Sequence, residues 1–202
     1  LNERIVGGGF RLPTEAEWEY ACRTGQHESL LLAETQGSME ALRSVAWYRQ
    51  NSLRNAKSHA DFVEIAAFAP RKVGSLQPNR WGLYDMQGNV AEWCSSLFRS
   101  YLYDAADSRE LFSIKGRRVL RGGGFADTAA SLHPAARHAE RPHRRLRWNG
   151  LRLARPSNQC RLPHQFRIPW QSLHFTFDAC VHVKNACVFL AACCQTVQLS
   201  SN

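Results

Sequence analysis

A short polar stretch near the middle of the chain carries oxygen ligands at the spacing that a hard cation requires. Asp85, Gly88, Asn89 and Glu92 lie close together in the sequence. Loop carboxylates and main-chain carbonyls at short spacing bind Ca²⁺, and a bend at Gly88 would turn carbonyl oxygens inward. An Asx-turn at Asp85 and an arginine partner for Glu92 would explain the same residues without a metal. The spacing by itself leaves both interpretations open.

The cysteines and histidines form no comparable pattern. Cys22 and Cys94 are the only cysteines before residue 155, and the others follow in the last part of the chain. The total is odd and no two are spaced as Cys-x-x-Cys, so neither a zinc site nor a complete disulfide framework is indicated. His133, His138 and His143 are evenly spaced and could hold a transition metal. Histidines in an arginine-rich loop are, however, typically solvated.

Positive charge is concentrated in one segment. The net charge is +9, and residues 137–155 contain seven arginines and one acid. A net positive charge of this size favours an anionic partner. Because no helix-turn-helix, zinc-finger or RNA-recognition pattern accompanies it, we expect no nucleic-acid partner. A solvated or internally paired arginine face is the alternative.

The chain length and composition indicate one globular domain that holds these residues in place. The 202 residues are 44% hydrophobic, which excludes a largely disordered chain. The longest apolar run, residues 186–194, is shorter than a bilayer-spanning helix, and no signal peptide is visible. The sequence therefore predicts no membrane span and leaves the compartment unknown.

One helix is well signalled near the start of the chain. Thr14 and Glu17 form a capping box, and Gly25 is placed to end the helix. Trp18, Ala21 and Cys22 follow i, i+3, i+4 spacing, so we expect them to face the core.

The expected strands are brief. Residues 45–48, 119–120 and 151–153 have strand composition and are separated by turn residues. A chain with such short elements must be held by loops packed around buried aromatic residues. This predicts an α+β fold with much irregular structure.

The composition changes after Arg155. Residues 156–202 contain no glycine and one acid, Asp178, and their apolar run at 186–194 fits a buried strand or a short helix. We interpret residues 1–155 as the domain and residues 156–202 as an appended segment of unknown structure.

Three motifs in a fixed order resemble the formylglycine-generating enzyme family, also called sulfatase-modifying factors. They are RLPTEAEWEYA at 11–21, PNRWGLYDMQGNVAEW at 78–93, and RVLRGGGF at 118–125 followed by NGLRLAR at 149–155. The resemblance covers residues 5–155. It implies a variant of the C-type lectin fold with a structural Ca²⁺ and, because family members begin well before the first motif, a truncated N-terminal part. The implied Ca²⁺ ligands are Asp85, Gly88, Val90 and Glu92.

The resemblance also implies an activity for which this chain lacks residues. Active members oxidise a sulfatase cysteine with O₂ at a Cu(I) ion held by two thiolates. Here the two cysteine positions fall on Asp127 and Leu132, and the motif serine falls on Gly124. Cu(I) is a soft ion that selects thiolate, which carboxylate and aliphatic groups cannot replace. We therefore expect no catalytic residues at these positions and no copper.

Many relatives without the cysteine pair are pseudoenzymes that display ligand-binding loops, some attached to kinases or to secreted bacterial proteins. By analogy, the loop 125–147 would bind a peptide, a protein or an anionic small ligand, since guanidinium groups capture carboxylate, sulfate or phosphate. Two alternatives stay open: an oxidase that uses unrecognised residues, such as the thiol of Cys160, and a truncated product without function. The expected ligand-binding residues are Arg137, Arg141, Arg144, Arg145 and Arg147.

Overall fold

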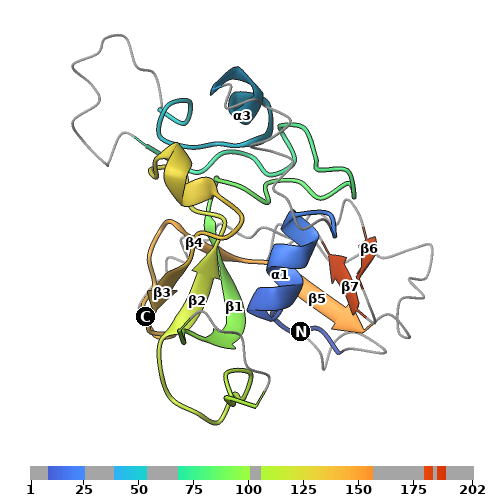
Figure 1. Ribbon diagram of the computed structural model, residues 1–202. Coiled ribbons are helices and arrows are strands. Elements are labelled where there is room, and N and C mark those ends of the chain that lie inside the picture. Colours follow the sequence, from blue (N-terminus) through green and yellow to red (C-terminus); the bar gives the residue numbers. More distant parts are fainter. Residues whose placement is uncertain are drawn as a thin grey trace, which may run out of the picture.

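A four-stranded sheet forms the centre of the molecule (Figure 1). The computed structural model describes residues 9–25, 39–53, 68–100, 106–156, 180–183 and 186–189. The strands follow the order β3-β2-β1-β4 across the sheet. Their bounds are Ala91–Leu97 for β1, Arg118–Arg121 for β2, His138–Glu140 for β3 and Asn149–Leu151 for β4.

The strand directions require one long connection across this sheet. β2 is antiparallel to both β1 and β3, whereas β4 is parallel to β1. β3 and β4 therefore run in the same direction at opposite edges of the sheet. Residues 141–148, the arginine-rich part of the chain, make the crossing between them.

The helix α1, Glu15–Cys22, confirms the predicted capping box. Glu17 N donates to Thr14 Oγ1 at 3.2 Å, and Thr14 N donates back to a Glu17 carboxylate oxygen at 2.9 Å. Gly25 follows with φ of +76°, a conformation that glycine adopts without strain. The helix packs against β1 and β2 (Figure 1).

Three groups of buried side chains make the core. The largest lies between α1 and the sheet and confirms Trp18, Ala21 and Cys22 as core residues. A second joins the helix α3, Met39–Val45, to the short 3₁₀ helix η3, Ala129–Leu132. A third surrounds Phe68, Val90 and Phe125. The irregular segments are thus held by aromatic and aliphatic packing, as the composition predicted.

The predicted strand at residues 45–48 is wrong. α3 ends at Val45, and Trp47 forms only an isolated bridge with Gly88. β1, with the sequence AEWCSSL, is a strand that sequence analysis did not predict. Its apolar and polar residues alternate only weakly. All but one of its side chains are buried, since α1 and neighbouring loops cover both faces of a central strand.

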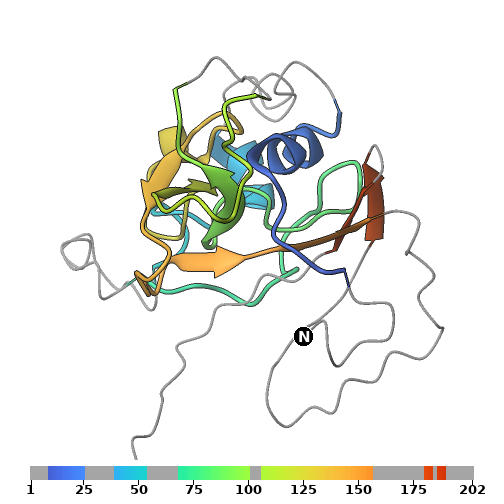
Figure 2. The same cartoon turned by 90° about the horizontal axis from the view of Figure 1, so that it is seen from below.

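A second sheet has the order β5-β7-β6. β5, Leu153–Pro156, ends the domain predicted from the sequence, and Ala154 also bridges to Arg11. β6, Cys180–Val183, and β7, Ala186–Phe189, come from the segment beyond it. β7 pairs directly with β5, so the described part of that segment is a strand pair attached to the domain (Figure 2).

No helix within the described ranges is long and apolar enough to cross a membrane.

Candidate functional site

Glu92, one of the expected Ca²⁺ ligands, lies in the core on β1 and is 1% exposed. Its carboxylate accepts hydrogen bonds from Trp18 Nε1 at 2.7 Å and from Arg152 Nε at 2.8 Å. Arg152 Nη2 adds a third contact at 2.7 Å. The arginine partner that sequence analysis kept as an alternative for Glu92 is therefore present.

Asp85 lies in the turn before β1 with φ of +51° and a buried side chain. Gly74 N donates to its Oδ2 at 2.7 Å, while Oδ1 is buried and makes no hydrogen bond within the structure. Burial raises the pKa of this carboxyl above its ordinary value of 3.8. A buried carboxylate oxygen that no donor satisfies fits a ligand atom for a cation.

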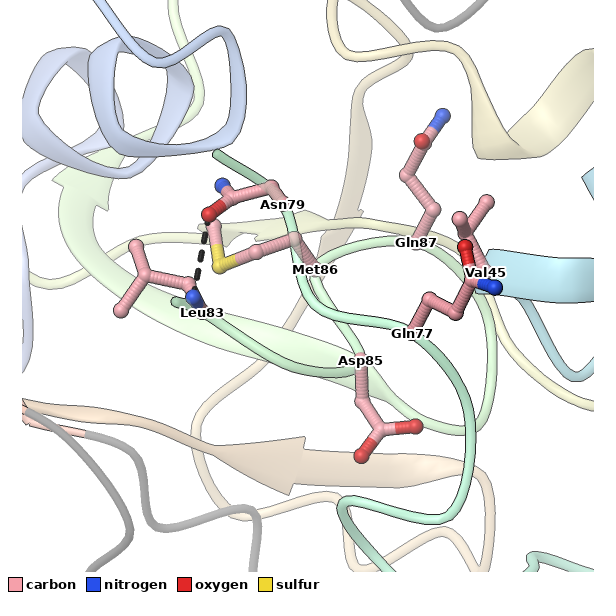
Figure 3. A pocket seen from close by; sticks show the side chains of 7 residues that line it. All are labelled: Val45, Gln77, Asn79, Leu83, Asp85, Met86 and Gln87. Atoms are coloured by element: carbon pink, nitrogen blue, oxygen red, sulfur yellow. Dashed lines mark hydrogen bonds between the residues drawn. The ribbon is translucent and has the colours of Figure 1, made fainter. Parts of the chain in front are cut away.

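A small pocket of about 10 Å³ adjoins this turn and has room for about one water molecule. Figure 3 shows that the side chains of Asp85 and Gln87, both on its lining, point to opposite sides. Gln87 Nε2 donates to Leu132 O at 2.7 Å, and its Oε1 is also without a partner. The two unpaired oxygens therefore do not converge on a single ion.

The rest of the turn joins two distant segments through its main chain. Gly88 N donates to Gly122 O at 2.8 Å, and Asn89 N donates to Trp47 O at 2.6 Å. Asn89 O accepts from Phe125 N at 2.8 Å. No three His, Cys, Asp or Glu side chains of the described residues gather as metal ligands. A Ca²⁺ at this turn would therefore need main-chain carbonyls such as those of Gly88 and Val90, the ligands that the family resemblance implies.

Asp127, which the family resemblance places at the first cysteine position, closes a turn. Its Oδ2 accepts from Gly124 N at 2.8 Å, and its main-chain oxygen accepts from Arg49 N at 3.0 Å. Gly124 itself is buried, and a Cβ there would be at ordinary contact distance, 3.6 Å from its nearest neighbour, Trp148 O. The Asp127 carboxylate therefore binds the main chain of its own loop.

Leu132, which the family resemblance places at the second cysteine position, is fully buried. It packs with Leu42, Ala46 and Tyr48, and it fills space between η3 and α3. The residue thus contributes apolar packing, and its side chain has no group that binds a metal.

The thiols of Cys22 and Cys94 are buried in the main core. Burial raises the pKa of Cys22 to about 12 and also raises the pKa of Cys94. Both groups stay protonated at neutral pH, whereas a metal or a nucleophilic reaction needs the thiolate.

The expected ligand-binding arginines fall into two groups. Arg137 forms an ion pair with Glu15, where Nη2 lies 2.7 Å from Oε2, and its guanidinium lies 4.7 Å from the Phe98 ring. Arg147 donates to Phe68 O at 2.8 Å and lies over the Phe125 ring. These two side chains hold the loop in place.

The other group, Arg141, Arg144 and Arg145, is exposed. Arg144 N donates to Arg141 O at 2.9 Å, and Asn149 N donates to Leu146 O at 3.0 Å, so two turns shape the crossing connection. Within the described ranges, none of the three guanidinium groups forms an ion pair. This group is available to an external anion.

A buried charge network that sequence analysis missed supports the neighbouring loop. One Arg121 nitrogen lies 2.7 Å from both Glu15 Oε1 and Glu19 Oε2, and another donates to Pro134 O at 2.7 Å. Glu15 and Glu19 stood in the first motif, but their partner lies about a hundred residues further along the chain. No local pattern could have identified it.

The evenly spaced histidines do not converge on a metal. His133 Nδ1 accepts from Ala135 N at 3.1 Å, while His138 and His143 are exposed.

This fold and the three motifs define a domain of the formylglycine-generating enzyme type, mixed α+β with little regular structure. Residues 2–157 match the family described as "Sulfatase-modifying factor enzyme 1-like domain", and the chain belongs to this family.

Individual relatives include enzymes and a protein named as inactive. The formylglycine-generating enzyme of Streptomyces coelicolor is 34% identical over 119 residues, which are 58% of this chain and 36% of that protein. The bovine (Bos taurus) "Inactive C-alpha-formylglycine-generating enzyme 2" is 34% identical over 123 residues, 60% of this chain and 34% of that one. The chain thus spans about a third of the length of these relatives.

Among solved structures, variable protein 1 of Treponema denticola aligns with a TM-score of 0.53 and 31% identity. The alignment covers 71% of this chain and 46% of the other.

Proposed function

We propose that the domain is a non-catalytic member of its family that binds a peptide, a protein or an anionic ligand. The observation that carries this proposal is the use of the two cysteine positions. Asp127 hydrogen-bonds to its own turn and Leu132 fills a core, so neither offers a ligand for a soft ion. The protonated, buried thiols of Cys22 and Cys94 give no substitute.

Two features favour binding as the remaining role. The bovine relative is itself named as inactive, so the family includes proteins without the activity. Arg141, Arg144 and Arg145 are exposed on a connection that Arg137 and Arg147 anchor at its ends. A rigid connection loses little conformational entropy when its side chains capture carboxylate, sulfate or phosphate.

The absence of oxidase activity can be tested directly. The purified chain, supplied with Cu(I), O₂ and a cysteine-containing sulfatase peptide, should consume no oxygen above the buffer rate. Mass spectrometry should find the peptide cysteine unconverted. Copper-dependent formylglycine formation would refute the proposal.

The binding role predicts that arginines of the connection recognise an anionic probe. Fluorescent polyglutamate should bind the chain, and Arg144→Gln with Arg145→Gln should weaken it about tenfold, which corresponds to about 1.4 kcal/mol. Arg43→Gln with Lys72→Gln removes the same charge from exposed positions elsewhere and should change the affinity less than threefold. Equal losses in both variants would mean that net charge alone attracts the probe.

We also propose a structural Ca²⁺ at the turn before β1, with Asp85 and Glu92 and the carbonyls of Gly88 and Val90 as ligands. The unpaired buried Oδ1 of Asp85 supports it, and an ion would supply the charge that this oxygen lacks. Glu92 would have to share its carboxylate with Arg152.

The pH dependence of stability tests whether the buried carboxylate of Asp85 destabilises the fold when no Ca²⁺ is bound. Because the pKa of Asp85 is raised in the folded state, its contribution to stability is complete below pH 3.8 and is lost as the pH rises through the folded value. In EGTA, Asp85→Asn should therefore be more stable than the original chain at pH 7, with the difference vanishing toward pH 3.8. Thermal melts over this range would measure it.

Adding Ca²⁺ at pH 7 should raise the melting temperature of the original chain and leave that of Asp85→Asn nearly unchanged. A Ca²⁺-induced shift of the same size in both proteins would exclude Asp85 as a ligand.

A further inference from the structure

The loop between β1 and β2 ends in an exposed apolar tip. It extends beyond the end of the sheet, away from α1 and α3 (Figure 1). At its end Leu111 is 51% exposed and Phe112 is 67% exposed. Phe112 is the most exposed large hydrophobic residue in the described part of the chain. Neighbouring apolar side chains exposed on one loop mark a candidate interaction surface.

The tip is rigid because Arg118 holds its main chain. This arginine is 8% exposed, and its Nη2 lies 3.1 Å from Leu111 O, 3.3 Å from Phe112 O and 2.9 Å from Ile114 O. Its Nη1 donates to Ser95 O on β1 at 2.6 Å, which ties the loop to the sheet. A loop held in this way presents its side chains without a large loss of conformational entropy on binding.

Exposed cations accompany the apolar residues at this end of the sheet. Phe98 N donates to Arg117 O at 2.9 Å, which places Arg117 at the end of the sheet from which the tip extends. The neighbouring acids are already engaged, since Glu110 accepts from Ser96 at 2.6 Å and Asp107 pairs with Arg109. The exposed cations of this end are Arg99, Lys115 and Arg117. Arg117 also donates to Ala139 O at 2.6 Å and lies over the Phe98 ring, which fixes its guanidinium at the surface.

We propose that this end of the domain docks on an anionic lipid surface. The tip, with Leu111 and Phe112, would enter the interface between headgroups and acyl chains. Arg99, Lys115 and Arg117 would meet the lipid phosphates. The combination favours a bilayer, because two exposed apolar side chains and three exposed cations belong to one end of the sheet, and the cations complement the charge of lipid phosphates. The surface is separate from the connection 141–148, so this proposal stands independently of the proposed function.

Vesicle binding tests this inference. The full chain should co-sediment with vesicles of phosphatidylcholine and phosphatidylglycerol at 7:3 and about tenfold less with pure phosphatidylcholine, in both cases at low salt. Leu111→Ser with Phe112→Ser should reduce binding to the anionic vesicles about tenfold. Because both side chains are largely exposed, the melting temperature should fall only slightly, through loss of the contact between the Phe112 ring and the Arg118 guanidinium at 5.5 Å. Trp148→Ser, at another exposed large hydrophobic residue, should leave vesicle binding within twofold.

The charged residues are tested separately. Lys115→Gln with Arg117→Gln should lower vesicle binding about tenfold and leave polyglutamate binding unchanged, which distinguishes this surface from the arginine connection. No binding to anionic vesicles, or binding that survives loss of Leu111 and Phe112, would overturn the proposal. A third outcome would also overturn the proposal: neither the original chain nor the tip variant binds vesicles, and the tip variant loses polyglutamate binding. The tip would then bind a protein partner.

Discussion

At the scale of single residues, buried charges are tied to each other. Glu92 and Arg152 are 1% and 0% exposed, and Trp18 adds a donor to the same carboxylate. A buried ion pair gains little over apolar residues, but removing one partner leaves the other charge without compensation. This pair therefore makes β1, α1 and the chain after β4 depend on one another.

Glu92→Gln should lower the free energy of unfolding by about 3 kcal/mol, because the Arg152 guanidinium would keep its charge in the core without a counterion. Urea unfolding in EGTA would measure it free of any metal effect. The control is Glu40→Gln, since Glu40 is exposed and lies 3.9 Å from Arg43. Its unfolding free energy should stay within about 0.5 kcal/mol. Equal effects of the two changes would contradict this account of the pair.

At the scale of elements, α1 organises its surroundings through its first turns. Glu15 and Glu19 bind Arg121 on β2, and Glu15 also binds Arg137 just before β3. Arg121 in turn holds the main chain at Pro134. The helix thus positions the loop that leads into the arginine connection, so its stability affects the candidate ligand surface.

Thr14→Ala should destabilise the protein by about 1 kcal/mol, because the hydroxyl accepts from Glu17 N and closes the capping box. Thr128→Ala is a matched control, since Thr128 is the N-cap of η3 and makes no side-chain capping hydrogen bond. Its melting temperature should stay close to that of the original chain. A comparable loss in both variants would mean that the hydroxyl of Thr14 contributes nothing specific.

At the scale of the whole molecule, long irregular segments meet at the turn before β1. Gly88 and Asn89 bond to Trp47 and to the loop with Gly122 and Phe125, which are two separate parts of the chain. Short elements cannot bury enough surface by themselves, so such junctions hold the fold together. The same turn carries the Ca²⁺ ligands proposed above.

Gly88→Ala should be strongly destabilising, by about 3 kcal/mol or more. A Cβ there would lie 2.3 Å from Trp47 O, and φ is +76°. Gly124→Ala is the control, because its Cβ would lie 3.6 Å from Trp148 O at an ordinary contact distance. Urea unfolding should place Gly124→Ala within about 1 kcal/mol of the original chain. Should Gly88→Ala be tolerated equally well, the close approach at Trp47 is not required.

Local chemistry was enough to predict several features. The capping box and the 3.6-residue spacing of α1 involve neighbours in the sequence, so Thr14, Glu17 and the core face of the helix followed from residue types. The three motifs likewise indicated the family, and the mixture of short segments with turn residues indicated an α+β fold.

Contacts between distant residues could not be predicted in this way. The pairing of Glu92 with Arg152, the ties of Arg137 and Arg147, and the burial of Leu132 all depend on side chains that folding brings together. β1 and α3 were missed for the same reason, since burial by packed neighbours overrides weak local preference. Residue types and spacing therefore established the family and the first helix, whereas packing determined which charges are neutralised in the core and which face the solvent.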